Sequence, residues 1–125
     1  MMWVAAAAGG ALGSLARHIV NQAFALVVTR PSPWATASVN LLGSGIIGVL
    51  AGLSASGRLS MSPTWRVFLQ VGILGGFTTF SSFMLDTLTL SQSGDTGMAF
   101  ANVAGQLFVG FAAVWFGYWL AVTIR

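Results

Sequence analysis

The chain has 125 residues, 56% of them hydrophobic and only 6% charged, with a formal net charge of +3 and a mean hydropathy of +0.86. Soluble domains carry roughly 25% charged residues, so this composition excludes an ordinary soluble domain and favours one small all-helical unit embedded in a membrane. The absence of cysteine excludes disulfides, thiolate metal sites and cysteine nucleophiles.

Apolar segments predict four membrane-spanning helices in a single domain over residues 1–125, at residues 3–28, 34–54, 65–90 and 97–124. Charged side chains are missing from residues 31–57, 67–85 and 96–124, and each stretch is close to or above the roughly 20 residues needed to cross a bilayer. The first segment is interrupted only by Arg17 and His18. A cleaved signal peptide is the alternative for this segment, but it lacks the basic region that precedes such a peptide.

Short connections separate these segments, and none of them could hold a catalytic domain. Turn residues mark the connections at residues 30–33, 54–63 and 91–97. Tryptophans fall at the expected water interfaces, as in an aromatic belt: Trp3, Trp34, Trp65 and Trp119. Paired carboxylates, an HExxH motif, a Walker loop and a plausible Ser-His-Asp set are all missing, so we do not expect an enzyme.

The five basic residues are all arginine, and they form no cluster that would bind nucleic acid. With a cytoplasmic N-terminus, Arg58, Arg66 and Arg125 would lie inside and Arg30 outside. This is a modest bias under the positive-inside rule, too small to exclude insertion in both orientations.

The third segment contains a sequence that disfavours a continuous helix. Three glycines and a Thr-Thr-Phe-Ser-Ser-Phe run occupy residues 72–83. Glycine costs about 1 kcal/mol relative to alanine in a helix interior, and Ser and Thr compete for backbone hydrogen bonds. Within the membrane, non-helical backbone is stable only where protein or a water-filled cavity provides hydrogen-bond partners for its N–H and C=O groups. We therefore predict a helix broken near its middle, a feature that tends to mark ion or substrate sites.

Polar amides lie on one face of two predicted helices. Asn40 has Thr36 and Ser44 one turn away, and Asn102 and Gln106 repeat the i, i+4 spacing. Either pair could simply bond to a neighbouring helix. The functional alternative for Asn40 is an amide donor to an anion or an oxygen ligand to a cation.

Arg17 is the only charge well inside a predicted span, and it continues the face of Gly9 and Gly13. It could snorkel to the headgroups, or line a wet vestibule and concentrate anions there. Asp86 is the only candidate for a membrane-embedded carboxylate of the kind that proton-coupled transporters carry.

Phe80 and Phe83 share a helix face beside Ser81 and Ser82. The edges of aromatic rings are electropositive, so these rings, together with hydroxyls and an amide donor, would suit a small anion. The alternative is that the two rings only pack against neighbouring helices, which is their more common role in membrane helices.

Glycine pairs at GxxxG spacing allow close helix packing: Gly9 with Gly13, Gly48 with Gly52, and Gly72 with Gly76. Because so small a bundle cannot easily enclose a pore, we expect an oligomer.

Three motifs together give the chain a resemblance to the CrcB/Fluc family of fluoride channels, over essentially its full length. A GGxxGxxxR motif matches residues 9–17, a TxxxN motif matches residues 36–40, and a GxxGGx[ST]TFS[ST]F motif matches residues 72–83. The last motif is long and unusual, which makes it the most specific.

The resemblance implies an antiparallel, dual-topology dimer in the cell membrane with two fluoride pores, each giving passive fluoride export that protects the cytoplasm. It implies that Phe80 and Phe83 line the pore, that Asn40 donates an amide, and that Thr36, Ser81 and Ser82 supply hydroxyls. Arg17 would lie near a vestibule. It also implies a central Na⁺ held by backbone carbonyls, here those of Gly75 and Thr78.

The fourth segment departs from the family pattern. Where many relatives carry an aromatic residue or histidine followed one turn later by serine, this chain has Gln106 and Gly110. We expect Gln106 and Asn102 on the pore side of this segment, and the partner to be a second copy or a paralogous subunit. Two other classes stay open: a small dual-topology proton-coupled multidrug antiporter, which would need Asp86, and a purely structural subunit.

Overall fold

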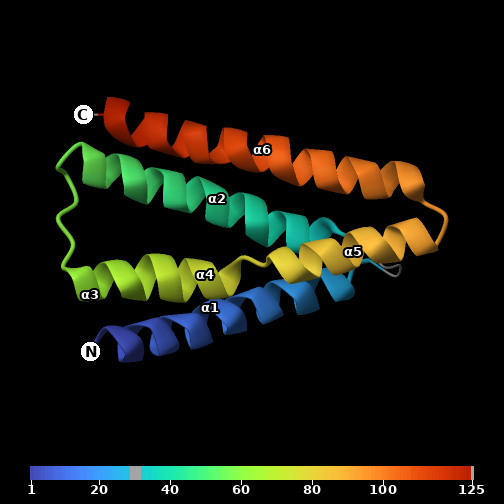
Figure 1. The fold of residues 1–125 in the computed structure, drawn as a ribbon, viewed down its shortest axis with the longest axis horizontal. Helices are drawn as coiled ribbons and strands as arrows, with labels where there is room; N and C mark the ends of the chain where they lie inside the picture. The colour runs from blue at the N-terminus through green and yellow to red at the C-terminus, as the bar shows by residue number, and fades with distance from the viewer. Residues whose placement is uncertain (29–31, 125) are drawn as a thin grey trace.

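A computed structural model describes residues 1–28 and 32–124, and every regular element within them is a helix (Figure 1). The elements are α1 (Met2–Ala25), α2 (Trp34–Ala55), α3 (Pro63–Arg66), the π-helix η1 (Val67–Leu74), α4 (Gly75–Phe77), α5 (Phe80–Gln92) and α6 (Thr96–Thr123). The all-helical prediction is confirmed, and most predicted boundaries lie within a few residues of the observed ones. The predicted turn at Arg30 and Pro31, and the position of Arg125, lie outside the described residues.

Three helical stretches of the described chain are long and apolar enough to cross a membrane: Trp34–Ala55, Pro63–Gln92 and Thr96–Thr123. The second comprises α3, η1, α4 and α5. The chain is therefore a multi-pass membrane protein. Helix α1, which carries Arg17 and His18, has 24 residues and so extends about 36 Å at 1.5 Å per residue.

The helices run up and down in two packed pairs (Figure 1). Helix α2 packs mainly against α6, and α1 packs mainly against η1 and α4. After the break, α5 packs against α6. The break therefore transfers the third stretch from one pair to the other, and residues from both pairs meet around it.

Glycines set how closely these helices approach. A β-carbon on Gly72 would lie 2.8 Å from Gly9 Cα, and one on Gly76 would lie 2.6 Å from the carbonyl oxygen of Gly10. Both distances are too short for a side chain, so η1 and α4 lie against the backbone of α1. Gly48 and Gly52 meet the backbone of α6 in the same way, which confirms the predicted packing role of the glycine pairs.

The break is confirmed, but its position differs from the glycine cluster. Gly72, Gly75 and Gly76 lie within helical segments, and the non-helical residues are Thr78 and Thr79. Gly72 and Gly76 pack closely on α1 as part of these helical segments, and the interruption falls on the two β-branched threonines that follow.

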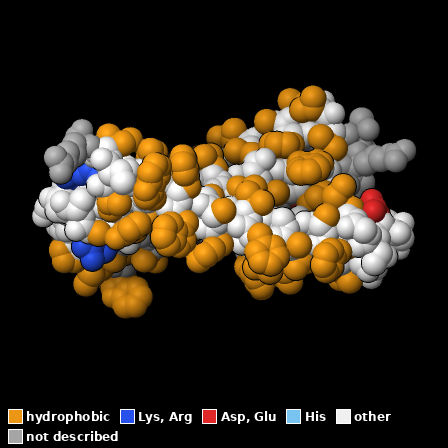
Figure 2. All heavy atoms as spheres, turned by 90° about the horizontal axis from the view of Figure 1, so that it is seen from above, with side chains coloured by type: hydrophobic (Ala, Val, Ile, Leu, Met, Phe, Trp, Pro, Cys, Tyr) orange, Lys and Arg blue, Asp and Glu red, His pale blue; other side chains and the backbone are white. Residues whose placement is uncertain are grey.

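The exterior shown in Figure 2 is largely apolar, with basic side chains at one end and an acidic group at the other. Each interface tryptophan is exposed: Trp3, Trp34, Trp65 and Trp119. An apolar surface with tryptophans near its ends is the pattern of a protein surrounded by lipid.

Candidate ion site at the helix break

The break consists of two extended residues in the middle of the 30-residue stretch Pro63–Gln92. Thr78 has φ −81° and ψ 159°, and Thr79 has φ −153° and ψ 122°. The Thr78 hydroxyl donates to the carbonyl of Leu74 at 2.9 Å, which closes the end of α4. The Thr79 hydroxyl oxygen accepts from Ser82 N–H at 3.2 Å and so caps the start of α5. The two threonines therefore end one helix and begin the next.

Two carbonyls at the break lose their usual helical partners. In a continuous α-helix, Thr79 N–H would donate to the carbonyl of Gly75, and Ser82 N–H to that of Thr78. Instead, Thr79 N–H donates to Asn40 Oδ1 at 2.8 Å, and Ser82 N–H is taken by the Thr79 hydroxyl. The carbonyls of Gly75 and Thr78 are thus available as oxygen ligands.

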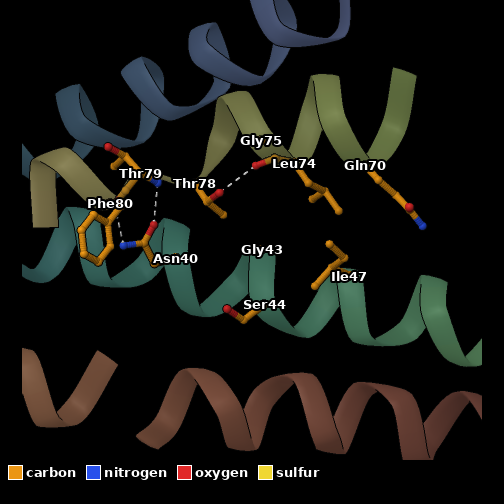
Figure 3. A pocket seen from close by; sticks show the side chains of 10 residues that line it. All are labelled: Asn40, Gly43, Ser44, Ile47, Gln70, Leu74, Gly75, Thr78, Thr79 and Phe80. Carbon is orange, nitrogen blue, oxygen red and sulfur yellow. Dashed lines mark hydrogen bonds between the residues drawn. The ribbon is translucent and has the colours of Figure 1, made fainter. Parts of the chain in front are cut away.

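Asn40 joins α2 to the break through both ends of its amide. Its Oδ1 accepts from Thr79 N–H, and its Nδ2 donates to the carbonyl of Thr79 at 3.0 Å, as Figure 3 shows. Its second N–H donates to Gln106 Oε1 at 2.7 Å. Asn40 therefore bonds between helices, and its role toward an anion stays a prediction.

Helix α6 adds a run of polar side chains to this cluster. Gln106 Nε2 donates to Asn102 Oδ1 at 2.8 Å, and Asn102 Nδ2 donates to Thr87 Oγ1 at 2.9 Å. Thr87 in turn donates to the carbonyl of Phe83 at 2.8 Å. The sequence placed Asn102 and Gln106 on one stripe but gave no role to Thr87. Its position four residues after Phe83, one turn along the same face, was the available signal.

The two phenylalanines at the start of α5 lie in different surroundings. Their ring centroids are 5.8 Å apart with an angle of 66° between the planes, an edge-to-face arrangement. Phe83 is 4% exposed, whereas Phe80 is 72% exposed. Ser81 is exposed beside them, and the Ser82 hydroxyl accepts from the Thr79 hydroxyl at 3.1 Å. Thr36 is buried in α2, one turn before Asn40.

An open groove of about 340 Å³ runs along the break (Figure 3). Residues from α2, η1, α4, the break and α5 line it: Asn40, Gly43, Ser44, Ile47, Gln70, Leu74, Gly75, Thr78, Thr79 and Phe80. The N-terminus of α5 brings a partial positive charge to the break, and the carbonyls before it bring negative charge. The site therefore presents groups for both ion signs close together.

Other predicted site residues lie away from this groove. Arg17 is half-buried on α1 and is not among the residues that line the groove. Asn102 and Gln106 line a second cavity of about 240 Å³ between α2 and α6. Asp86 lines a third, of about 310 Å³, and its buried Oδ2 has no hydrogen-bond partner among the described residues.

The chain is similar to known proteins over most of its length. The family model described as "CrcB-like protein, Camphor Resistance (CrcB)" matches residues 4–118. The chain is 47% identical over 120 residues to a protein of Opitutus terrae, covering 95% of this chain and 91% of the relative. It is 42% identical over 126 residues to one of Rhodospirillum rubrum, covering 100% and 98% of the two chains. A Thermus thermophilus relative is 46% identical over 112 residues, covering 90% and 88%. All three relatives are named fluoride-specific ion channel FluC.

Proposed function

The chain belongs to the CrcB family, and we propose on that basis that it is a fluoride-specific ion channel giving passive fluoride export. One observation carries the proposal. The matched region contains a helix broken in the middle of a membrane span, with the partly positive N-terminus of α5 and two phenylalanines at the break. Broken membrane helices of this kind typically hold ions by their free ends.

The anion path that we propose follows the first turns of α5. The electropositive ring edges of Phe80 and Phe83 and the hydroxyls of Ser81 and Ser82 are suited to a small anion, because both can replace part of its hydration shell. Thr36 and Asn40 flank this path from α2, and Arg17 raises the local anion concentration in a vestibule. None of these groups offers a cation a full oxygen shell, so the path favours fluoride over a cation.

A second copy of the chain, or a paralogous subunit, completes the site in this proposal. Lipid cannot hydrogen-bond to the groove along the break, yet Asn40, Ser44, Gln70 and Thr78 line it. Phe80 is also largely uncovered. An antiparallel partner would cover the groove, and a two-fold arrangement would give two equivalent pores. Helix α1 is long enough to serve as the fourth span of each subunit.

The carbonyls of Gly75 and Thr78 fit the Na⁺ site that the family implies. Both carbonyls lose their helical partners at the break, and hard cations prefer such oxygen ligands. A bound Na⁺ would supply positive charge at the centre of the dimer and link the two subunits.

The alternative of a proton-coupled multidrug antiporter rests on Asp86, whose buried oxygen lacks a partner among the described residues. The relatives, named as fluoride-specific channels, do not favour it.

Growth of a fluoride-sensitive bacterium tests the proposed function. Expression of this chain in a strain that lacks its own fluoride exporter should restore growth in millimolar fluoride. Failure of a membrane-inserted, expressed protein to restore growth would contradict the proposal.

A further inference from the structure

We propose that Gln106 is a positioning residue of the anion path, which acts on Phe80 through Asn40 and Thr79. This inference rests on the proposed function as a fluoride channel. Gln106 lies on α6 and Phe80 at the start of α5, and two hydrogen bonds through Asn40 join Gln106 to Thr79, the residue before Phe80.

The first half of this chain of hydrogen bonds fixes the backbone before Phe80. Gln106 Oε1 accepts from Asn40 Nδ2 at 2.7 Å, and Asn40 bonds to both the N–H and the carbonyl of Thr79. Figure 3 shows the Asn40 amide directed from α2 toward the break. Because Thr79 immediately precedes Phe80, the hydrogen bonds from the Asn40 amide fix the backbone position from which the Phe80 side chain extends. Gln106 in turn accepts the second N–H of that amide and so helps to hold its direction.

The second half of the chain of hydrogen bonds leads from Gln106 on α6 back to α5, the helix that begins with Phe80. Gln106 donates to Asn102, Asn102 donates to Thr87, and Thr87 donates to the carbonyl of Phe83. All five bonds, from Thr79 N–H to the Phe83 carbonyl, run in one donor direction. Such a chain strengthens each of its bonds through polarisation. The chain therefore starts one residue before Phe80 and ends on Phe83, so it ties the two phenylalanines together.

Gln106 is the central member because it must accept and donate at once. Methionine has a similar length but neither of these groups. The Gln106→Met substitution would leave an N–H of Asn40 and the Oδ1 of Asn102 unpartnered. In a membrane span, no water is available to replace them. We expect the Asn40 amide to turn, which weakens its two hydrogen bonds to Thr79 and makes the position of the Phe80 ring less well defined.

The test compares Gln106→Met, Thr87→Val and the double variant in liposomes, with initial efflux of fluoride and of chloride measured separately. Gln92→Met, at the exposed end of α5, is the matched glutamine control. Thr89→Val is the matched threonine control, because Thr89 donates to the carbonyl of Leu85 at 2.9 Å but lies outside the chain. Unfolding midpoints in detergent report folding of each variant.

We expect Gln106→Met to slow fluoride efflux about tenfold or more, since small displacements of a positioned group are costly. Thr87→Val, at the end of the chain, should slow it about two- to threefold. The double variant should be no slower than Gln106→Met, because both changes break one chain. Gln106→Met should also lower the ratio of fluoride to chloride efflux, since a freed Phe80 discriminates less well. The controls should change neither rate nor ratio.

Three results would overturn the inference: a Gln106→Met rate equal to that of Gln92→Met, slower efflux with an unchanged fluoride-to-chloride ratio, or multiplicative effects in the double variant. An unchanged ratio would mean that Gln106 only alters the number of folded channels. If Gln106→Met does not fold, Thr87→Val serves as the test. A fluoride-to-chloride efflux ratio of Thr87→Val equal to that of Thr89→Val would then overturn the inference. Absence of fluoride efflux from the wild-type protein would instead overturn the proposed function itself.

Discussion

Replacing Asn40 with alanine removes the only side chain among the described residues that hydrogen-bonds to the broken backbone from another helix. Three hydrogen bonds are lost: two to Thr79 and one to Gln106. At roughly 0.6–1.7 kcal/mol for an interhelical hydrogen bond in a membrane protein, this amounts to about 2–5 kcal/mol of unfolding free energy. Thr79 is buried, so water cannot replace the lost partners of its N–H and carbonyl.

The loss can be measured by titrating the purified protein from a mild detergent into sodium dodecyl sulfate. The five tryptophans report unfolding through their fluorescence. Asn21→Ala is the matched control, because Asn21 is exposed on α1. We expect a clearly lower midpoint for Asn40→Ala and an unchanged one for Asn21→Ala. Equal midpoints for the two variants would refute the claim that Asn40 stabilises the break.

Other substitutions test the packing, the anion path and the alternative function. Gly72→Ala would place a β-carbon 2.8 Å from Gly9 Cα, so we expect a loss of about 1–3 kcal/mol in the same titration. A β-carbon at Gly10 meets nothing within 4 Å, so Gly10→Ala should lose no stability and gain up to about 1 kcal/mol from helix propensity, and equal losses for the two would contradict the packing. Phe80→Ile and Phe83→Ile remove the ring edges from the path, and each should slow fluoride efflux from liposomes by about tenfold or more. Unchanged efflux in both would favour a structural subunit. Wild-type liposomes should show no proton-driven uptake of an organic cation such as ethidium; uptake that Asp86→Asn abolishes would favour the antiporter.

The sequence predicted the helices and the break because both depend on local chemistry. Long uncharged runs fix where spans lie, and the Thr-Thr-Phe-Ser-Ser-Phe run disfavours a continuous helix. The position of the break could not be predicted from the glycines, because glycine serves close packing as well as irregular backbone. Gly72 and Gly76 remain helical against α1, and Thr78 and Thr79 become extended.

Helical spacing predicted which polar side chains of the candidate site share a face, but not which residues of other helices they contact. An i, i+4 spacing shows that Asn102 and Gln106 share a face, but it does not say which side chain of another helix they meet. The bond from Gln106 to Asn40 depends on how α2 and α6 pack, and the role of Thr87 depends on where α5 turns after the break. The covering partner, the Na⁺ and the roles of Arg17 and Thr36 stay predictions.

Fluoride efflux from liposomes that contain only the purified chain measures whether this protein conducts fluoride by itself. A fluoride electrode should record efflux well above that of protein-free liposomes, driven by the fluoride gradient alone and much faster than chloride efflux under the same conditions. Correctly folded protein that releases no more fluoride than empty liposomes, or that releases chloride as readily, would contradict the account.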